Sequence, residues 1–350
     1  MKYRRLAWLG ALAAICATAA GSITGTQYAQ AAEKEWKMHL VFVPSRPEAQ
    51  SVVHFVDLVN EKAADELSIK LYSGGSLGLK DADMLRILPR GAAVQATALY
   101  PGYLSRDRPE YADTLPPAVI TDHEVGVSLN PILEDIYRKT YDEVGIELLS
   151  LLGHGTRDLY IICKDPVSNL EQLRTKKLRV WEQSLVDMFA KVGVSAQIIG
   201  QNDLYMALQT GVVDCTIYPV GLAPTLSLQE VAPYASYIGP YMLQPITLIV
   251  SREAFNQLSE KTQKIVRDAA KQVEKESFDT FLSGKYDVEG QKVYEAGGGK
   301  VIDAFPDADR NAIVEAARAG WAERIKSASA TAQQNYEAVN KHMTDSAAAK

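Results

Sequence analysis

The sequence predicts an α/β protein of two lobes, in which mixed sheets are flanked by helices and one long helix spans both lobes. Strand-like apolar segments alternate with amphipathic helical segments along the chain. The 350 residues, 47% of them hydrophobic, suffice for two packed cores at roughly 150 residues per domain. Residues 259–296 contain no proline and predict a helix several times longer than the mean of about 11–12 residues.

The N-terminus has the pattern of a secretory signal peptide over residues 1–31. An uncharged stretch, 6–20, follows the cations Lys2, Arg4 and Arg5. Ala29 and Ala31 supply the small residues that signal peptidase recognises before a cleavage site. We expect cleavage before Ala32 and a periplasmic mature protein. The apolar stretch is shorter than the ~20 residues of a membrane-spanning helix. Lipid attachment at Cys16 is the less favoured alternative, because bulky Ile15 precedes it.

The first lobe is predicted to hold residues 32–153 together with 244–282. Its strands are expected at 37–43, 69–72, 94–99, 146–152 and 246–250, and its helices at 49–66, 81–88 and 124–144.

The second lobe is predicted to hold residues 154–243 together with 283–340, followed by a disordered tail at 341–350. Its strands are expected at 158–163, 178–181, 196–199, 213–217 and 301–304, with a capping box at 168–171 starting a helix. The helix over 259–296 has Gly284 and Gly290 as weak points, so it is either one helix or two joined end to end. Residues 309–343 are expected to be helical.

Charge and cysteine content limit the partners and the chemistry. A net charge of −6 makes nucleic acid an unlikely partner. Cys163 and Cys215 each lie in a predicted strand; export permits a disulfide, but a chain of this size does not need one, so we expect two unpaired buried thiols. The five histidines show no metal-ligand spacing.

Two neighbouring strands carry the most informative side chains. Arg179 lies in the strand predicted at 178–181, and Tyr218 directly follows the strand predicted at 213–217. Both can emerge at strand ends around one crevice. A planar guanidinium offers two parallel donors that match a carboxylate, so this crevice is expected to bind an organic anion.

The order of motifs resembles the solute-binding proteins of tripartite ATP-independent periplasmic (TRAP) transporters, the DctP-type family. The motifs are 73–78 with Asp83 five residues later, Leu115-Pro116-Pro117, 155–157, 177–180 and, most specific, the run 203–214. The resemblance covers nearly all of the mature chain. It implies a periplasmic binding protein fold whose lobes close over a small organic acid and deliver it to membrane permease subunits, with no cofactor, and we expect a monomer.

The resemblance also implies which residues bind the ligand. Arg179 matches the arginine that holds the substrate carboxylate in the family, and Arg157 matches one that often assists; Asp83 is a further candidate. Several positions depart from the family. Tyr218 replaces an asparagine, Gln201 stands where an aromatic residue is common, and Trp181 stands where a small residue or proline is frequent.

These departures favour a particular ligand. With Tyr100, Tyr103 and Tyr241 expected on the opposing face, the aromatic walls favour an aromatic or hydrophobic carboxylate, and a dicarboxylate is the alternative. Ile217 stands where the 2-oxo-acid branch has a glutamate, so no metal is expected.

Two other classes of protein stay open. Residues 74–78 match the Gly-x-Ser-x-Gly elbow of serine esterases with Ser76 as nucleophile, although no oxyanion segment or Asp–His pair accompanies it. The glycines more simply allow a turn with positive backbone angles. A binding protein of an ATP-driven importer or of a periplasmic sensor would share the two-lobed closure.

Overall fold

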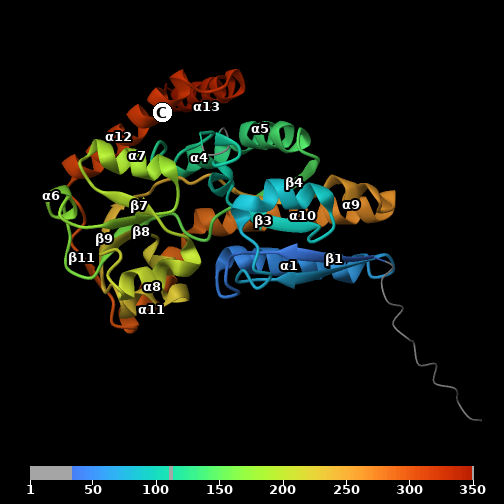
Figure 1. The fold of residues 1–350 in the computed structure, drawn as a ribbon, viewed down its shortest axis with the longest axis horizontal. Coiled ribbons are helices and arrows are strands. Elements are labelled where there is room, and N and C mark those ends of the chain that lie inside the picture. Colours follow the sequence, from blue (N-terminus) through green and yellow to red (C-terminus); the bar gives the residue numbers. More distant parts are fainter. Residues whose placement is uncertain (1–33, 110–112, 349–350) are drawn as a thin grey trace, which may run out of the picture. The chain divides into compact units, whose positions relative to one another are not determined.

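Two mixed β-sheets form the framework of residues 34–109 and 113–348, the part of the chain that this computed structural model describes (Figure 1). The predicted signal peptide, its cleavage site and Cys16 lie outside the described residues. The first sheet has the order β2-β1-β3-β10-β4. Its strands are β1 (Lys34–His39), β2 (Leu67–Tyr72), β3 (Ala96–Leu99), β4 (Ile146–Leu152) and β10 (Ile246–Ser251).

The second sheet has the order β11-β9-β5-β8-β6-β7. Its strands are β5 (Leu159–Cys163), β6 (Leu178–Val180), β7 (Ala196–Ile198), β8 (Cys215–Tyr218), β9 (Tyr234–Gly239) and β11 (Lys300–Ile302).

Both sheets combine parallel and antiparallel pairs. In the first, β1 runs parallel to β2 and β3, whereas β10 lies antiparallel between β3 and β4. In the second, β5 is antiparallel to β8 and β9, while β6 runs parallel to both β7 and β8. The chain thus leaves the first sheet after β4, builds most of the second, and returns to insert β10. The predicted mixed α/β architecture is confirmed.

Side chains alternate across the second sheet and meet helices on both faces. Leu159 and Ile161 of β5 pack in one cluster with helices α7 and α12, whereas Tyr160 and Ile162 pack in another with α8 and α11. Figure 1 shows the same two layers around β8 and β9. A strand buried on both faces is almost wholly apolar, which explains the run Leu-Tyr-Ile-Ile-Cys of β5.

The helices follow from apolar stripes and end signals. In α1, Pro47 stands in the first turn, where its missing N–H is tolerated, and Val52, Phe55, Val56 and Val59 form one buried stripe. The α-helices are α1 (Pro47–Lys62), α2 (Met84–Ile87), α4 (His123–Ser128), α5 (Asn130–Asp142), α6 (Leu170–Leu173), α7 (Gln183–Lys191), α8 (Leu204–Gln209), α9 (Arg252–Asn256), α10 (Glu260–Ser283), α11 (Lys285–Ala296), α12 (Asp307–Lys326) and α13 (Ala330–Ala348). Short 3-10 segments are η1 (Asp81–Asp83), η2 (Leu88–Arg90), η3 (Pro101–Leu104), η4 (Gln201–Asp203), η5 (Val220–Leu226) and η6 (Leu228–Glu230).

The long helix is two helices joined end to end, as one of the two predicted alternatives has it. Gly284 separates α10 from α11 with a φ of +64°, a conformation that favours glycine. A side chain there would also collide with Arg157, since a Cβ atom would lie 2.0 Å from its Nη2. Helix α10 contacts α1 and β4 beside the first sheet, and α11 contacts η5 beside the second, so the pair spans both halves.

Several elements differ from the sequence predictions. The helix expected over 309–343 is divided into α12 and α13, with residues 327–329 between them. The helix predicted over 124–144 is divided into α4 and α5 at Leu129, with Pro131 in the first turn of α5. Strand β9 was not predicted. Helix α13 continues to Ala348, so the tail expected to be disordered from residue 341 is helical through residue 348.

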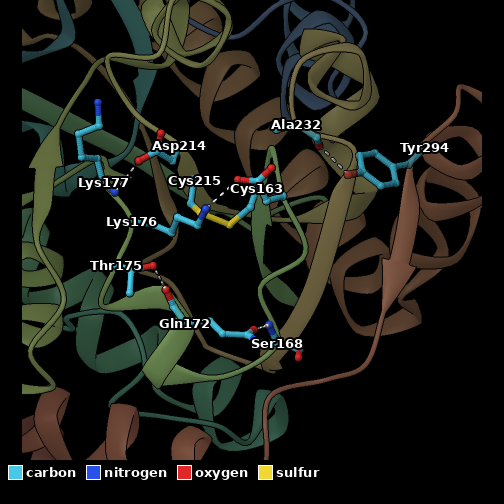
Figure 2. The surroundings of a disulfide bond; sticks show 11 residues. Cys163, Ser168, Gln172, Thr175, Lys176, Lys177, Asp214, Cys215, Ala232 and Tyr294 are labelled. Atoms are coloured by element: carbon cyan, nitrogen blue, oxygen red, sulfur yellow. Dashed lines mark hydrogen bonds and ion pairs between the residues drawn. A yellow bond between two sulfur atoms is a disulfide. The ribbon is translucent and has the colours of Figure 1, made fainter.

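Cys163 and Cys215 form a disulfide, so the prediction of two unpaired thiols is wrong. Figure 2 shows the bond joining neighbouring strands, close to Lys177 and Asp214. The two cysteines face each other in the antiparallel register of β5 and β8, and both are buried. The sequence places both in strands, but register depends on the packing of the whole sheet.

Among the described residues, no helix combines the length and the apolar content needed to cross a lipid bilayer.

We predict that the disulfide stabilises the protein by about 4 kcal/mol, because it closes a long loop in the unfolded chain; the cysteines are 52 positions apart. The variant Cys163→Ala/Cys215→Ala should therefore unfold at lower denaturant concentration than the oxidised wild type. Added reductant should lower the midpoint of the wild type and leave that of the variant unchanged. A variant as stable as the oxidised wild type would contradict the prediction.

Candidate functional site

A cavity of about 50 Å³ lies where loops following strands of both sheets meet. The first sheet contributes residues that follow β1, β3 and β4, and the second contributes residues in or after β6 and β8. Most of the wall is aromatic or apolar. The lining residues are Phe42, Arg46, Tyr100, Tyr103, His154, Thr156, Arg179, Trp181, Gln201, Tyr218, Pro219, Leu222 and Leu243.

Arg179 is a buried cation that faces this cavity. It lies in β6 with 1% of its surface exposed, and its Nε donates a hydrogen bond to the carbonyl of Ile199 at 2.8 Å. Its Nη1 is buried and has no hydrogen-bond partner among the described residues. Burial lowers the pKa of Arg179 below its usual value. The guanidinium therefore keeps hydrogen-bonding capacity and positive charge available for an anion.

Arg46 is a second buried cation, but it is already paired. Its Nε and Nη2 donate to the two carboxylate oxygens of Glu48 at 3.0 and 2.8 Å. Burial alone would lower the pKa of Arg46, but the charge of Glu48 and their hydrogen bonds raise it above its usual value. Burial likewise opposes the charge on Glu48, yet Arg46 holds the pKa of that carboxyl well below its usual range. Both groups are thus charged.

Arg46 also connects the two sides of the cavity. Its Nη1 donates to Oε1 of Gln201 at 2.7 Å and to the hydroxyl of Tyr218 at 2.9 Å. Arg46 follows β1 of the first sheet, whereas Gln201 and Tyr218 follow or end strands of the second. These hydrogen bonds hold the two walls together.

Flat rings form much of the remaining wall. Tyr100 and Tyr103 meet edge to face with centroids 5.4 Å apart, and the guanidinium of Arg179 lies 5.9 Å from the Trp181 ring. The guanidinium carbon of Arg46 lies 4.7 Å from the centroid of the Phe42 ring. Aromatic faces of this kind favour a planar or apolar body attached to the ligand's anionic group.

Six of the residues that the sequence places at the site lie together at this cavity. They are Tyr100, Tyr103, Arg179, Trp181, Gln201 and Tyr218. Arg179 and Tyr218 occupy adjacent strands, β6 and β8, as their positions in the sequence predicted.

Three predicted site residues lie elsewhere. The side chain of Arg157 extends to the junction of α10 and α11, where Nη1 donates to the carbonyl of Leu282 at 3.1 Å. Asp83 is bound on the surface by Arg106 at 2.8 Å. Tyr241 is buried beside a different hollow, between β9 and α12. The structure therefore does not bring these three residues to the cavity.

Sequence reasoning missed Arg46, His154 and Phe42. A signal was present, since Phe42 and Arg46 follow β1 in the first parallel strand pair, and ligands in α/β proteins bind beyond the carboxyl ends of such strands. In the sequence, an arginine and a glutamate two residues apart look like an ordinary surface ion pair, so Arg46 and Glu48 did not indicate a binding site.

Ser76 has the geometry of a turn. Gly74, Gly75 and Gly78 all have positive φ, and the next helical segment, η1, begins only at Asp81. A nucleophile elbow requires the helix to begin at the serine. Within residues 34–109 and 113–348, no three His, Cys, Asp or Glu side chains are grouped so that they could hold a metal ion. The predicted absence of a metal stays a prediction.

Glu182 lies behind the cavity wall. It has 2% of its surface exposed, and both its carboxylate and the ring of Tyr100 lie against Gly102, where a Cβ atom would meet Oε2 of Glu182 at 2.2 Å. Burial raises the pKa of Glu182 to about 7, although a hydrogen bond from Ser184 opposes the shift.

A cavity between two sheets, with a buried arginine in its wall, is the arrangement expected of a two-lobed solute-binding protein. Comparison with known proteins supports this class. Residues 39–328 match the family model of bacterial extracellular solute-binding protein, family 7 (DctP). The chain belongs to this family, whose members are receptors of TRAP transporters.

Individual relatives are distant. A solute-binding protein of Sulfitobacter sp. (strain NAS-14.1) is 25% identical over 221 residues, which are 62% of this chain and 66% of the relative. A TRAP periplasmic solute-binding protein from Desulfovibrio salexigens, with bound orotic acid, has a TM-score of 0.79 at 21% identity, covering 89% and 99% of the two chains. A Bordetella pertussis receptor binding pyroglutamic acid has a TM-score of 0.78 at 21% identity, covering 88% and 99%. These structures share the fold.

We predict that Glu182 makes stability depend on pH. Its pKa in the folded protein, about 7, is above the ordinary 4.5, so the folded state binds the proton more tightly and stability falls as pH rises between these values. From about pH 5 to pH 8 the loss should be about 2 kcal/mol. In Glu182→Gln this loss should disappear in urea unfolding, whereas Glu289→Gln, at an exposed carboxylate of α11, should keep it. An unchanged pH profile in Glu182→Gln would contradict the assignment.

Proposed function

We propose that this protein is the extracytoplasmic receptor of a TRAP transporter and captures a small organic acid anion, whose carboxylate binds to Arg179. The observation that carries the proposal is the buried guanidinium of Arg179, which faces the cavity with Nη1 unpaired among the described residues. A buried charge without a partner costs several kcal/mol, so binding a carboxylate there is strongly favoured. No catalytic step is proposed.

The proposed ligand is an aromatic or hydrophobic carboxylate. The rings of Tyr100, Tyr103, Trp181 and Tyr218, together with Leu222 and Leu243, make most of the cavity wall aromatic or apolar. Orotic and pyroglutamic acid, bound by two structural neighbours, are both cyclic acids with one carboxyl group. A dicarboxylate is the second candidate, and the presence of two arginines, Arg46 and Arg179, at the cavity favours it.

The proposed lobes follow the two sheets. The first, residues 32–153 with 244–282, contains all strands of the first sheet, and the second, 154–243 with 283–340, contains all strands of the second. In the open form the lobes separate, and the ligand first meets Arg179. Closure then forms the hydrogen bonds from Arg46 to Gln201 and Tyr218. The ligand favours closure only by its stronger binding to the closed state.

The proposed partners are the permease subunits in the membrane, and the receptor works as a monomer. Export through the predicted signal peptide would place it in the periplasm, in agreement with the extracellular character of the family.

We predict that Arg179→Lys weakens binding about tenfold or more, because lysine cannot make two parallel hydrogen bonds to a carboxylate. The acid that co-purifies with the wild type, identified by mass spectrometry, should be measured by calorimetry. Arg157→Lys is the matched control, since Arg157 lies outside the cavity, and its affinity should stay within about twofold of the wild type. Equal affinities for Arg179→Lys and wild type would show that Arg179 does not hold the carboxylate.

We predict that ring-bearing acids stabilise the protein more than short dicarboxylates do. In a thermal-shift screen, benzoate, orotate and pyroglutamate should include compounds that raise the melting temperature, because a ligand that binds only the folded state stabilises it. Stabilisation by succinate, malate and fumarate alone would instead support the dicarboxylate candidate.

A further inference from the structure

We propose that Glu48 sets the charge of the ligand: by neutralising Arg46 it leaves the cavity one uncompensated positive charge, so the receptor selects small acids with a single negative charge and rejects dianions. This inference rests on the proposed function and deepens it. It also decides between the two ligand candidates, because the apparent second cation is already compensated.

The Arg46–Glu48 pair is closed to a ligand on geometric grounds. Four of the five N–H donors of Arg46 are used: two by Glu48, one by Gln201 and one by Tyr218. Its face lies on Phe42. A ligand carboxylate would therefore have to take the place of Gln201 and Tyr218 at Nη1, and it would still share the charge of Arg46 with the carboxylate of Glu48.

Glu48 is fixed independently of Arg46. It has 1% of its surface exposed, does not line the cavity, and accepts a hydrogen bond from the backbone N–H of Gly155 at 3.2 Å. His154 follows β4 and holds Nδ1 3.8 Å from Glu48, while its Nε2 lies 2.7 Å from the carbonyl of Gln244. The carboxylate is thus fixed where the segments that follow β1 and β4 meet, outside the lining of the cavity.

The other charged residues near the cavity, Arg179 and Glu182, also favour a ligand with a single negative charge. Arg179 has no carboxylate partner among the described residues, so it supplies the uncompensated charge. Glu182 lies behind Tyr100 and, when ionised, opposes any further negative charge. A dianion would bury one carboxylate without a counter-charge, which is strongly unfavourable in an enclosed site.

The test uses pairs of acids that differ by one charge and little in shape: succinate with succinamate, and terephthalate with 4-carbamoylbenzoate. Calorimetry at about pH 8 keeps both carboxyl groups of each diacid ionised. For the wild type, each amide monoanion that binds should bind about tenfold or more tightly than its dianion partner, equivalent to about 1.4 kcal/mol. A dianion that binds as tightly as its monoanion partner would overturn the inference without any variant.

The variants separate charge from structure. Glu48→Gln keeps the size and an acceptor oxygen but leaves Arg46 uncompensated, so the preference for the monoanion should fall about tenfold or reverse. Arg46→Gln/Glu48→Gln removes both charges and should restore the wild-type preference. An unchanged ratio in Glu48→Gln, or a double variant that behaves like it, would refute the role of Glu48.

The outcomes also distinguish this inference from the proposed function. If Arg179→Lys loses binding while the charge ratio does not respond to Glu48→Gln, the receptor function stands and the inference fails. If none of the four acids, and no acid that co-purifies, binds to the wild type, both fail. Should Glu48→Gln not fold, as judged by circular dichroism, the wild-type comparison of each acid pair still decides the question.

Discussion

The cost of burying the guanidinium of Arg179 is the constraint on which the site depends. The side chain is buried with 1% of its surface exposed, and within the described part of the chain its Nε donates to the carbonyl of Ile199 while its Nη1 has no hydrogen-bond partner. A charge removed from water in this way must be compensated by whatever enters the cavity. Under the proposed function, ligand charge is therefore a more important condition for stable closure than ligand shape.

The fold provides this constraint through its topology. Strand β10 returns to the first sheet after the chain has built most of the second, so the chain crosses between the halves repeatedly. Strand ends of both sheets consequently meet at one place, and Arg46 and Arg179 reach the same cavity from opposite sides. The charge of Arg46 is compensated by Glu48, two residues away. Arg179 has no carboxylate partner among the described residues.

Much of the framework was predictable from the sequence. Alternating apolar segments identified most strands of both sheets, and β4 has the predicted bounds. Gly284 was recognised as a weak point in the long helix. Such features depend on local patterns of side chains. Strand β9 and the Cys163–Cys215 pairing depend on which strands become neighbours, and local patterns do not contain that information.

Some residues of the site were likewise predictable from the sequence, and others were not. Arg179 and Tyr218 were predictable because they mark the ends of neighbouring strands. The location of the Arg157 side chain was not predictable, because a motif gives a position in the chain but not the direction of the side chain, and here Asp287 and the carbonyl of Leu282 hold it away from the cavity. Arg46 and Glu48 resemble a surface ion pair until burial is known.

The disulfide between Cys163 and Cys215 can form only when β5 and β8 pair in the correct register. Facing side chains alternate along paired strands, so a slip of one residue between β5 and β8 would turn the two sulfur atoms to opposite faces of the sheet. Oxidation is then sterically impossible. Tyr218 lies three residues beyond Cys215 on the same strand. Formation of the disulfide therefore requires the strand register that also directs the Tyr218 side chain to the cavity.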